Sequence, residues 1–355
     1  MKKIKVGVVL SGLKNQGPVN VVRTLVNKRK SVKYTIFCLS DNIDDIILSE
    51  FIDYGVEVYF TKENSFFKRI LFLYQILKKH PQDVIHSHGI TADLYCCFIK
   101  NKKISTVHNR LLEDYIPLFG FFVGHMAYYV HAFILGRFNH LVSCAESVDV
   151  ILENAKINPN KSVIRNGVNL EKFKVLNPDE KEKLRVQYGF DHKDNILVYC
   201  GSLSKRKNVI GLLKRLQLNA NDRLIIVGDG PLDSECRKIV EHDARYIFTG
   251  SIESPVNYYQ IANVFLSASE SEGFPLALLE AYASGCILFV SNIPSHAEIS
   301  HLLNNNCIYL FDLSDMKINI PNNIFENVPA HQNFSKISDA EMSRQYELLF
   351  HSIID

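Results

Sequence analysis

Two carboxylates eight residues apart stand out among the side chains of this sequence that could do chemistry. Glu272 and Glu280 belong to the segment Ser269–Gly285, which follows a short apolar run and turns at Gly273. The residues after the turn have helical apolar spacing, with Pro275 at about the first position, where an amide donor has no intrahelical partner. Unpaired N–H groups at a helix start bind anions, and a nearby carboxylate accepts from vicinal hydroxyls. The segment therefore predicts a site for an anionic ligand that carries sugar hydroxyls.

The same segment resembles the Glu-x7-Glu signature of the retaining glycosyltransferases of family 4, which have the two-domain GT-B fold. Its Gly-Phe-Pro and Glu-Ala-x-Ala-x-Gly sequences distinguish it from an ordinary strand–turn–helix with two surface carboxylates. In that family the helix amides bind the donor diphosphate, the second glutamate binds the ribose and the first lies beside the transferred sugar. The resemblance implies a catalytic role for Glu272. It implies donor binding by Gly273, Phe274, Leu276, Ala277 and Glu280.

A second candidate is the loop after the apolar run 196–200, which carries Lys205, Arg206 and Lys207. Cations at this point would neutralise a diphosphate, as a metal does in other transferases. The family often has Gly-Arg-Leu here, followed by a lysine. This sequence keeps Lys207 but has Ser202 at the position of the arginine. The resemblance therefore implies that Lys207 is catalytic and binds the donor, and Arg206 would supply the missing charge.

Further candidates follow other predicted strands, because open α/β sheets bind ligands beyond the carboxyl ends of their strands. In the family a glycine of the first loop lies over the diphosphate, which implies donor binding by Gly17. The Thr-Val-His sequence resembles the family's pocket histidine, so His108 is a third predicted catalytic residue. His88 is placed on the acceptor side, and His86 is interpreted as structural. The Thr-Gly-Ser-Ile loop implies a contact between the nucleotide base and Ile252.

The sequence does not favour a metal-dependent reaction. It contains no Asp-x-Asp pair that could hold a cation on the diphosphate, and no carboxylate with ligand spacing lies beside the histidine loops. Cationic side chains and a helix dipole can stabilise the leaving nucleoside diphosphate instead. We therefore expect no cofactor and no metal, with the nucleotide sugar as co-substrate. Retention of configuration, and uridine as the default base, follow from the resemblance alone.

Strand-like apolar runs alternate with helical patterns along the sequence, which predicts an α/β fold of parallel sheets with helices on both faces. A chain of 355 residues exceeds one typical core. The pattern restarts after a charged segment, 177–195, interpreted as one helix. We expect two Rossmann-like, doubly wound domains that face each other across a cleft, as in GT-B. Their bounds are 1–175 for the acceptor-side domain, 176–335 for the nucleotide-sugar domain, and 336–355 for a helix that crosses back.

The charge of the chain is unevenly divided. The 40 basic and 38 acidic residues give +2. Residues 1–175 carry 24 basic and 15 acidic residues, or +9, which leaves 16 and 23, or −7, for the remainder. The basic half indicates an anionic partner, a membrane surface or nucleic acid, or simply a solvated face. Nucleic acid is disfavoured because no recognisable module interleaves basic with exposed aromatic residues. The basic, amphipathic segment Phe66–Lys79 predicts either a helix on an anionic membrane or a core helix.

Cysteine use and the apolar segments bear on the compartment. The eight cysteines form no Cys-x-x-Cys pair, which is typical of reduced thiols in a cytosolic protein. The N-terminal apolar run is too short for a signal peptide and is interpreted as a strand. Segment Tyr115–Phe138 is apolar but contains His125, His131 and Arg137, so a hairpin of buried or interfacial helices is favoured over a spanning helix. We expect a cytoplasmic protein, peripheral on the inner face of the plasma membrane.

These observations predict a glycosyltransferase that moves a sugar from a nucleotide-sugar donor to a glycan or lipid-linked glycan, as in capsule or O-antigen biosynthesis. Two alternatives stay open. A sugar-nucleotide 2-epimerase has the same architecture, although no acid–base pattern for it is present. A non-catalytic GT-B subunit that binds a nucleotide sugar or a partner transferase is kept open by Ser202. The stretch 304–334 is rich in Asn and Pro and is expected to be loop.

Overall fold

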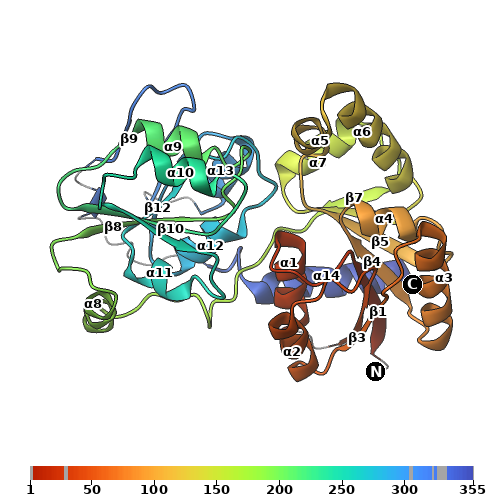
Figure 1. The fold of residues 1–355 in the computed structure, drawn as a ribbon. Helices are drawn as coiled ribbons and strands as arrows, with labels where there is room; N and C mark the ends of the chain where they lie inside the picture. The colour runs from red at the N-terminus through yellow and green to blue at the C-terminus, as the bar shows by residue number, and fades with distance from the viewer. Residues whose placement is uncertain (1–2, 28–30, 304–306, 322–323, 326–333, 355) are drawn as a thin grey trace. The chain divides into compact units, whose positions relative to one another are not determined.

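The chain forms two compact units in a computed structural model (Figure 1). The structure describes residues 3–27, 31–303, 307–321, 324–325 and 334–354. Unit 1 comprises Met1–Gly167 and Asp339–Asp355, and unit 2 comprises Val168–Ser338. The change of unit thus falls at Gly167 rather than at residue 175, and the terminal helix belongs to the first unit.

Unit 1 is built on a seven-stranded parallel sheet with the order β3-β2-β1-β4-β5-β6-β7. The interior strand β1, between β2 and β4, is apolar almost throughout because helices cover both faces, and Val6, Val8 and Val9 have no exposed surface. The strands are β1 (Ile4–Leu10), β2 (Val32–Cys38), β3 (Glu57–Phe60), β4 (Val84–His88), β5 (Lys102–Val107), β6 (His140–Ser143) and β7 (Asn160–Val163).

The strand order places the helices of unit 1 on opposite faces of its sheet. The chain moves outward from β1 to β3 and then back across to β4, β5 and β6, and right-handed crossovers in opposite directions lie on opposite faces. The helices are α1 (Gly17–Asn27), α2 (Asp45–Asp53), α3 (Phe66–Lys79), α4 (Ile90–Cys96), α5 (Leu111–Phe119), α6 (Phe121–Leu135), α7 (Glu146–Asn154) and α14 (Asp339–Ile354).

Helix α14 completes the core of unit 1. The hydroxyls of Tyr346 and Thr106 lie 2.8 Å apart. Phe350 meets Tyr34 edge to face, with ring centroids 6.3 Å apart. Both aromatic side chains of the helix are fully buried. The helix-periodic C-terminal segment is therefore a packed element of this unit and no loose tail.

Helices α5 and α6 form a tight hairpin, as expected for the apolar segment that contains them. The chain turns at Gly120, whose φ of 77° suits glycine. A Cβ on Gly124 would lie 2.8 Å from the Ile116 backbone, so the two helices meet backbone to backbone. No helix in the described part of the chain is long and apolar enough to cross a membrane.

The basic helix α3 packs on the core of unit 1, as one of its two sequence interpretations requires. Leu73 and Leu77 are buried under the helix, whereas Phe67, Leu71 and Tyr74 are exposed. It is thus a core helix on one side and carries apolar groups among lysines on the other.

Unit 2 contains a six-stranded parallel sheet with the order β11-β10-β8-β12-β13-β14 and a separate two-stranded sheet, β15-β9. The doubly wound order confirms the predicted pair of Rossmann-like folds. The strands are β8 (Asn195–Cys200), β9 (Leu216–Gln217), β10 (Asp222–Val227), β11 (Tyr246–Gly250), β12 (Val264–Ser267), β13 (Ile287–Ser291), β14 (Ile308–Phe311) and β15 (Ile318–Asn319).

Two local predictions for unit 2 were wrong. The stretch 304–334 is not only loop, because β14 and β15 lie in it; residues 304–306, 322–323 and 326–333 fall outside the described residues. The charged segment 177–195 is helical only to Gln187, since Gly189 adopts a φ of 81°. The helices are α8 (Pro178–Gln187), α9 (Val209–Arg215), α10 (Asp233–Ile239), α11 (Val256–Ile261), α12 (Leu276–Ala283) and α13 (Pro294–Leu303).

The loops at the carboxyl edge of the unit 2 sheet are bonded to one another. Gly228 has a φ of 132°, and a Cβ there would lie 2.1 Å from the carbonyl oxygen of Gly201. The amide of Leu203 donates to the backbone carbonyl of Asp229, and the amide of Glu270 donates to the backbone carbonyl of Arg206. The glycines of the Val-Gly-Asp-Gly-Pro turn therefore let the β10 loop support the β8 loop, and the β8 loop in turn contacts the β12 loop.

Candidate active site

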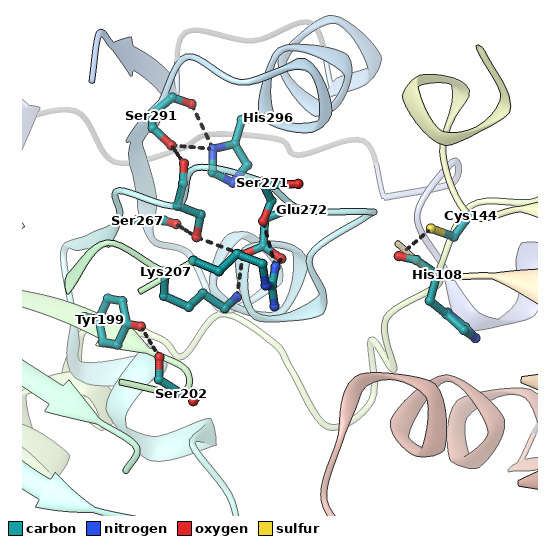
Figure 2. Close-up of polar contacts among 12 residues, drawn as sticks. His108, Cys144, Tyr199, Ser202, Lys207, Ser267, Ser271, Glu272, Ser291 and His296 are labelled. Atoms are coloured by element: carbon teal, nitrogen blue, oxygen red, sulfur yellow. Dashed lines mark hydrogen bonds and ion pairs between the residues drawn. The ribbon is translucent and has the colours of Figure 1, made fainter. Parts of the chain in front are cut away.

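The cationic loop after β8 meets the first carboxylate of the β12 loop. The Lys207 amine lies 2.5 Å from one oxygen of Glu272, and the Arg206 guanidinium lies 2.9 Å from the other (Figure 2). Arg206 also donates to the carbonyl of Ser271 at 2.6 Å. The three charged groups sum to +1. The site is therefore a pre-assembled cation pair on one carboxylate, with positive charge to spare for an anion.

Glu272 is charged although it is only 8% exposed. Burial raises the pKa of this carboxyl, but Lys207 and Arg206 outweigh burial, and the pKa falls to about 2. The hydroxyl of Ser269 also donates to it at 2.8 Å. Glu272 thus stays ionised at every physiological pH and holds both cations in place.

Hydrogen bonds from β13 and α13 hold the β12 loop that carries Glu272. Ser291, at the end of β13, donates to the carbonyl of Ser269 at 2.7 Å. His296 on α13 bonds through Nδ1 to the carbonyl of Ser291 at 2.8 Å, and its buried Nε2 has no hydrogen-bond partner among the described residues. Burial lowers the pKa of His296 to about 4, while the nearby Glu272 raises it. Sequence reasoning missed this histidine, because nothing in its local pattern indicates proximity to Glu272.

The second carboxylate, Glu280, lies on α12 and also belongs to this region. The hydroxyl of Tyr259 donates to it at 3.4 Å. Burial raises the pKa of the Cys200 thiol to about 12, with Glu280 raising it and Lys207 lowering it. The Lys207 amine follows the same strand end, since it lies 3.8 Å from where a Cβ on Gly201, next to Cys200, would be. Glu280 and Lys207 therefore lie around one strand end rather than on separate faces of the unit.

The start of α12 supplies amides beside these side chains. Pro275 is the N-cap, one position earlier than the sequence indicated, and Leu276 and Ala277 open the first turn. First-turn N–H groups cannot bond within the helix, so they face out of its start. Gly273 and Phe274, in the loop before the helix, are buried. The structure thus brings the predicted diphosphate-binding residues of unit 2 into one strand–loop–helix segment.

The remaining donor-side predictions of unit 2 lie on neighbouring loops. Ile252 is half-buried in the loop after β11. Ser202 is exposed after β8, and its carbonyl accepts from the hydroxyl of Tyr199 at 2.9 Å. The Ser202 position thus contributes a backbone contact, while the second cation comes from Arg206.

The predicted residues of unit 1 lie at the carboxyl ends of β1, β4 and β5. Nδ1 of His88 and Nε2 of His108 are 2.8 Å apart. Burial lowers the pKa of His108 to about 4 and that of His88 well below its ordinary value, so both imidazoles are neutral. His86 is buried and bonds Thr106 at 2.7 Å, as its structural interpretation requires. Gly17 opens α1, and no atom of the described part of the chain lies within 4 Å of where a Cβ would be.

Comparison with known proteins agrees with this architecture. The family model Glycosyltransferase Family 4 matches residues 17–172, and the model Glycosyl transferases group 1 matches residues 180–311. Together the two matches run through both sheets. The chain is therefore a glycosyltransferase of GT-B fold, whose first half matches the family 4 model and whose second half matches the group 1 model.

The most similar curated proteins include O-antigen biosynthesis glycosyltransferase WclY of Escherichia coli, 26% identical over 83% of this chain and 82% of that protein. A second is the UDP-Gal:alpha-D-GlcNAc-diphosphoundecaprenol alpha-1,3-galactosyltransferase of Escherichia coli, 26% identical over 70% of this chain and 67% of that protein. Among solved structures, Anabaena HepE in complex with UDP and glucose covers 98% of this chain and is itself fully covered, with a TM-score of 0.77 and 15% identity. That likeness shows the shared fold.

Proposed function

We propose that this glycosyltransferase moves a hexosyl group, with retention, from a UDP-sugar to a glycan or lipid-linked glycan during surface polysaccharide biosynthesis. The observation that carries the proposal is the cation pair of Lys207 and Arg206 on buried Glu272, beside the α12 amides and Glu280. A pyrophosphate needs such positive charge, and a ribose needs such a carboxylate. The names of the relatives support the donor class and the O-antigen setting.

In the proposed reaction the sugar–phosphate bond breaks while the acceptor oxygen bonds the anomeric carbon from the same face. The leaving phosphate takes the acceptor proton, so no protein nucleophile is required. Lys207, Arg206 and the first-turn amides of α12 stabilise the charge that develops on the diphosphate. Glu272 lies beside the transferred sugar, and neutral His108 contacts a sugar hydroxyl. One relative's name states an alpha linkage, which an alpha-linked donor sugar yields only by retention.

Thermal-shift measurements with a panel of nucleotide sugars test the donor proposal. UDP and one UDP-sugar are expected to stabilise the protein, because a ligand that binds only the folded state raises its melting temperature. Stabilisation without transfer or donor hydrolysis would favour the non-catalytic subunit that Ser202 keeps open. No response to any uridine nucleotide would refute the donor proposal.

Replacing Glu280 by alanine is expected to raise KM for the donor about 10- to 100-fold, with a smaller change in kcat. The physical reason is that a charged acceptor bound to the ribose contributes roughly 1.5–3 kcal/mol to binding. Steady-state kinetics with the donor found by thermal shift would measure it. Glu241→Ala, which removes an exposed carboxylate after α10, is the control. Equal KM values for both variants would contradict the assignment of Glu280.

Chelation of divalent metal is expected to leave turnover unchanged. The diphosphate is neutralised by Lys207, Arg206 and helix amides in this proposal, so no cation has to bridge it. Turnover measured after EDTA treatment, and again after Mg²⁺ or Mn²⁺ is added back, checks this. A loss on chelation that either metal restores would overturn the metal-free mechanism.

We further propose that the protein works in the cytoplasm at the inner face of the plasma membrane. The exposed side of α3 presents Phe67, Leu71 and Tyr74 among basic residues, a composition that binds anionic lipid surfaces. A lipid-linked acceptor, as in the name of one relative, would be reached from there.

A further inference from the structure

The outer face of helix α6 is exposed and apolar. Eight of the 21 exposed large apolar side chains in the described part of the chain fall within residues 119–133. Phe122 is 85% exposed and Phe133 is 67% exposed. The eight are Phe119, Phe121, Phe122, Val123, Met126, Tyr129, Val130 and Phe133. We call this set the hairpin face.

The spacing of these residues shows a continuous stripe. Phe122, Met126, Tyr129, Val130 and Phe133 recur at three- and four-residue intervals, which places them on one side of a helix. Residues 115–136 contain no Asp, Glu, Lys or Arg. A surface helix normally turns charged residues to water, and a large exposed apolar patch marks a docking surface.

Two polar side chains of the hairpin, those of Tyr115 and His131, point the other way, into unit 1. The hydroxyl of Tyr115 lies 2.6 Å from Nδ1 of His131, and Nε2 of His131 lies 2.9 Å from Asp93 on α4. Asp93 also accepts from Ser87 of β4 at 2.5 Å. All four groups are buried. This network anchors the hairpin with its apolar face outward, so a simple rotation of α6 cannot hide that face.

We propose that the hairpin face inserts into the interfacial region of an anionic lipid bilayer. This inference extends the proposed membrane contact of α3, and the choice of a bilayer as the partner rests on that proposal. It does not depend on the proposed transfer reaction. Helix α6 has 15 residues and is therefore about 22 Å long, short of the roughly 30 Å of a bilayer core. It would lie along the interface, with its apolar side toward the acyl chains.

Charge and continuity favour a bilayer over a protein partner. Between Phe66 and Arg137 the chain has nine basic and four acidic residues. Helix α4 links the hairpin to α3, since it bonds His131 on one side and its Tyr95 ring lies 5.0 Å from Phe66 on the other (Figure 1). Protein interfaces carry about one hydrogen bond per 100–200 Å², whereas polar groups are few at the hairpin face: the hydroxyl of Tyr129 and the partly exposed ring of His125, 4.3 Å from that of Phe121. Apolar groups flanked by basic residues match acyl chains beneath anionic headgroups.

The absence of tryptophan from the sequence allows a direct test. A single tryptophan introduced as Tyr129→Trp would report from the hairpin face, and Val186→Trp, on exposed α8 of unit 2, would serve as the control. With vesicles of equal parts phosphatidylglycerol and phosphatidylcholine, the emission of Tyr129→Trp is expected to shift to the blue and to be quenched by brominated acyl chains. The control should show neither effect. Unquenched emission from Tyr129→Trp would overturn the proposal.

A flotation assay with the full chain gives an independent result. The triple variant Phe122→Gln, Met126→Gln, Phe133→Gln is expected to partition at least about tenfold more weakly into the same vesicles. The matched control replaces three exposed apolar residues elsewhere: Val186→Gln, Met316→Gln and Leu348→Gln. Equal flotation of both variants, at unchanged melting temperature, would refute the proposal that the hairpin face inserts into the bilayer. A concentration-dependent dimer that the triple variant abolishes, with no vesicle binding, would assign the face to a second copy. Neither assay uses donor or acceptor, so the outcome is separate from that of the transfer test.

Discussion

Replacing Lys207 by alanine is expected to lower the turnover of sugar transfer by about 10²–10³-fold, the loss seen when one group that stabilises developing charge is removed. The amine lies 2.5 Å from buried Glu272 and 3.8 Å from where a Cβ on Gly201 would be. It is therefore held at the end of β8 before any ligand binds. Such a charge needs no reorganisation when the diphosphate departs, which is why its removal should affect kcat more than KM.

Two further variants separate charge from packing. Lys207→Met keeps the aliphatic stem and should be as inactive as Lys207→Ala. Lys205→Ala removes the same charge from an exposed position of the same loop and should retain turnover. Single-turnover kinetics with the identified donor is the measurement. Turnover of Lys207→Ala within a few-fold of wild type, at an unchanged melting temperature, would remove the lysine from the mechanism.

Replacing Glu272 by glutamine is expected to destabilise the protein by about 3 kcal/mol at pH 7. The folded pKa of about 2 lies below the ordinary value of 4.5 for a glutamate, and each pKa unit corresponds to about 1.4 kcal/mol. The same variant leaves the two cations Lys207 and Arg206 without their carboxylate. Removing one partner of a buried ion pair is strongly destabilising, because the charge that remains is not compensated.

The pH dependence gives the sign of this effect. A carboxyl with a lowered folded pKa stabilises the protein fully above its unfolded pKa, and the contribution is lost as pH falls toward the folded pKa. Between pH 6 and pH 3 the wild type should therefore lose about 2 kcal/mol more of its free energy of unfolding than Glu272→Gln. Urea unfolding across this range measures the difference. The control Glu270→Gln removes an exposed carboxylate of the same loop, and its free energy of unfolding should change with pH as that of the wild type does. If the free energy of unfolding of Glu272→Gln also changed with pH as the wild type's does, Glu272 would not be buried and paired.

The site depends on contacts that local sequence patterns do not encode. Glu272 and Lys207 are 65 residues apart in the chain, and their pairing exists because β8 and β12 are neighbours in the sheet. His296 approaches Glu272 only because α13 follows β13 at the same edge. A motif names residue types at fixed spacing, so it identified the loops but not the ion pair between them.

The sequence pattern also failed to predict two short strands, because their pairing with neighbouring strands outweighs the conformational preference of their own residues. The strands β14 and β15 lie in a stretch whose Asn and Pro content is typical of loops. Strand β14 forms because its backbone pairs with β13, from Leu288↔Ile308 to Ser291↔Phe311. An edge strand of this kind is specified by the partner's open backbone as much as by its own residues.

The two α/β folds can be predicted from the amino-acid sequence alone, because strands buried on both faces must be apolar throughout and the helices between them must have one apolar side. The loops that could hold a donor can be predicted in the same way, since strand ends, glycines and cations can be located without coordinates. The coordinates were needed to show that Arg206 and Lys207 share Glu272 and that α6 turns its apolar side outward. The reason is physical: a helix that is apolar on every side has no preferred inner face, and the buried bonds of His131 to Asp93 and Tyr115 select one.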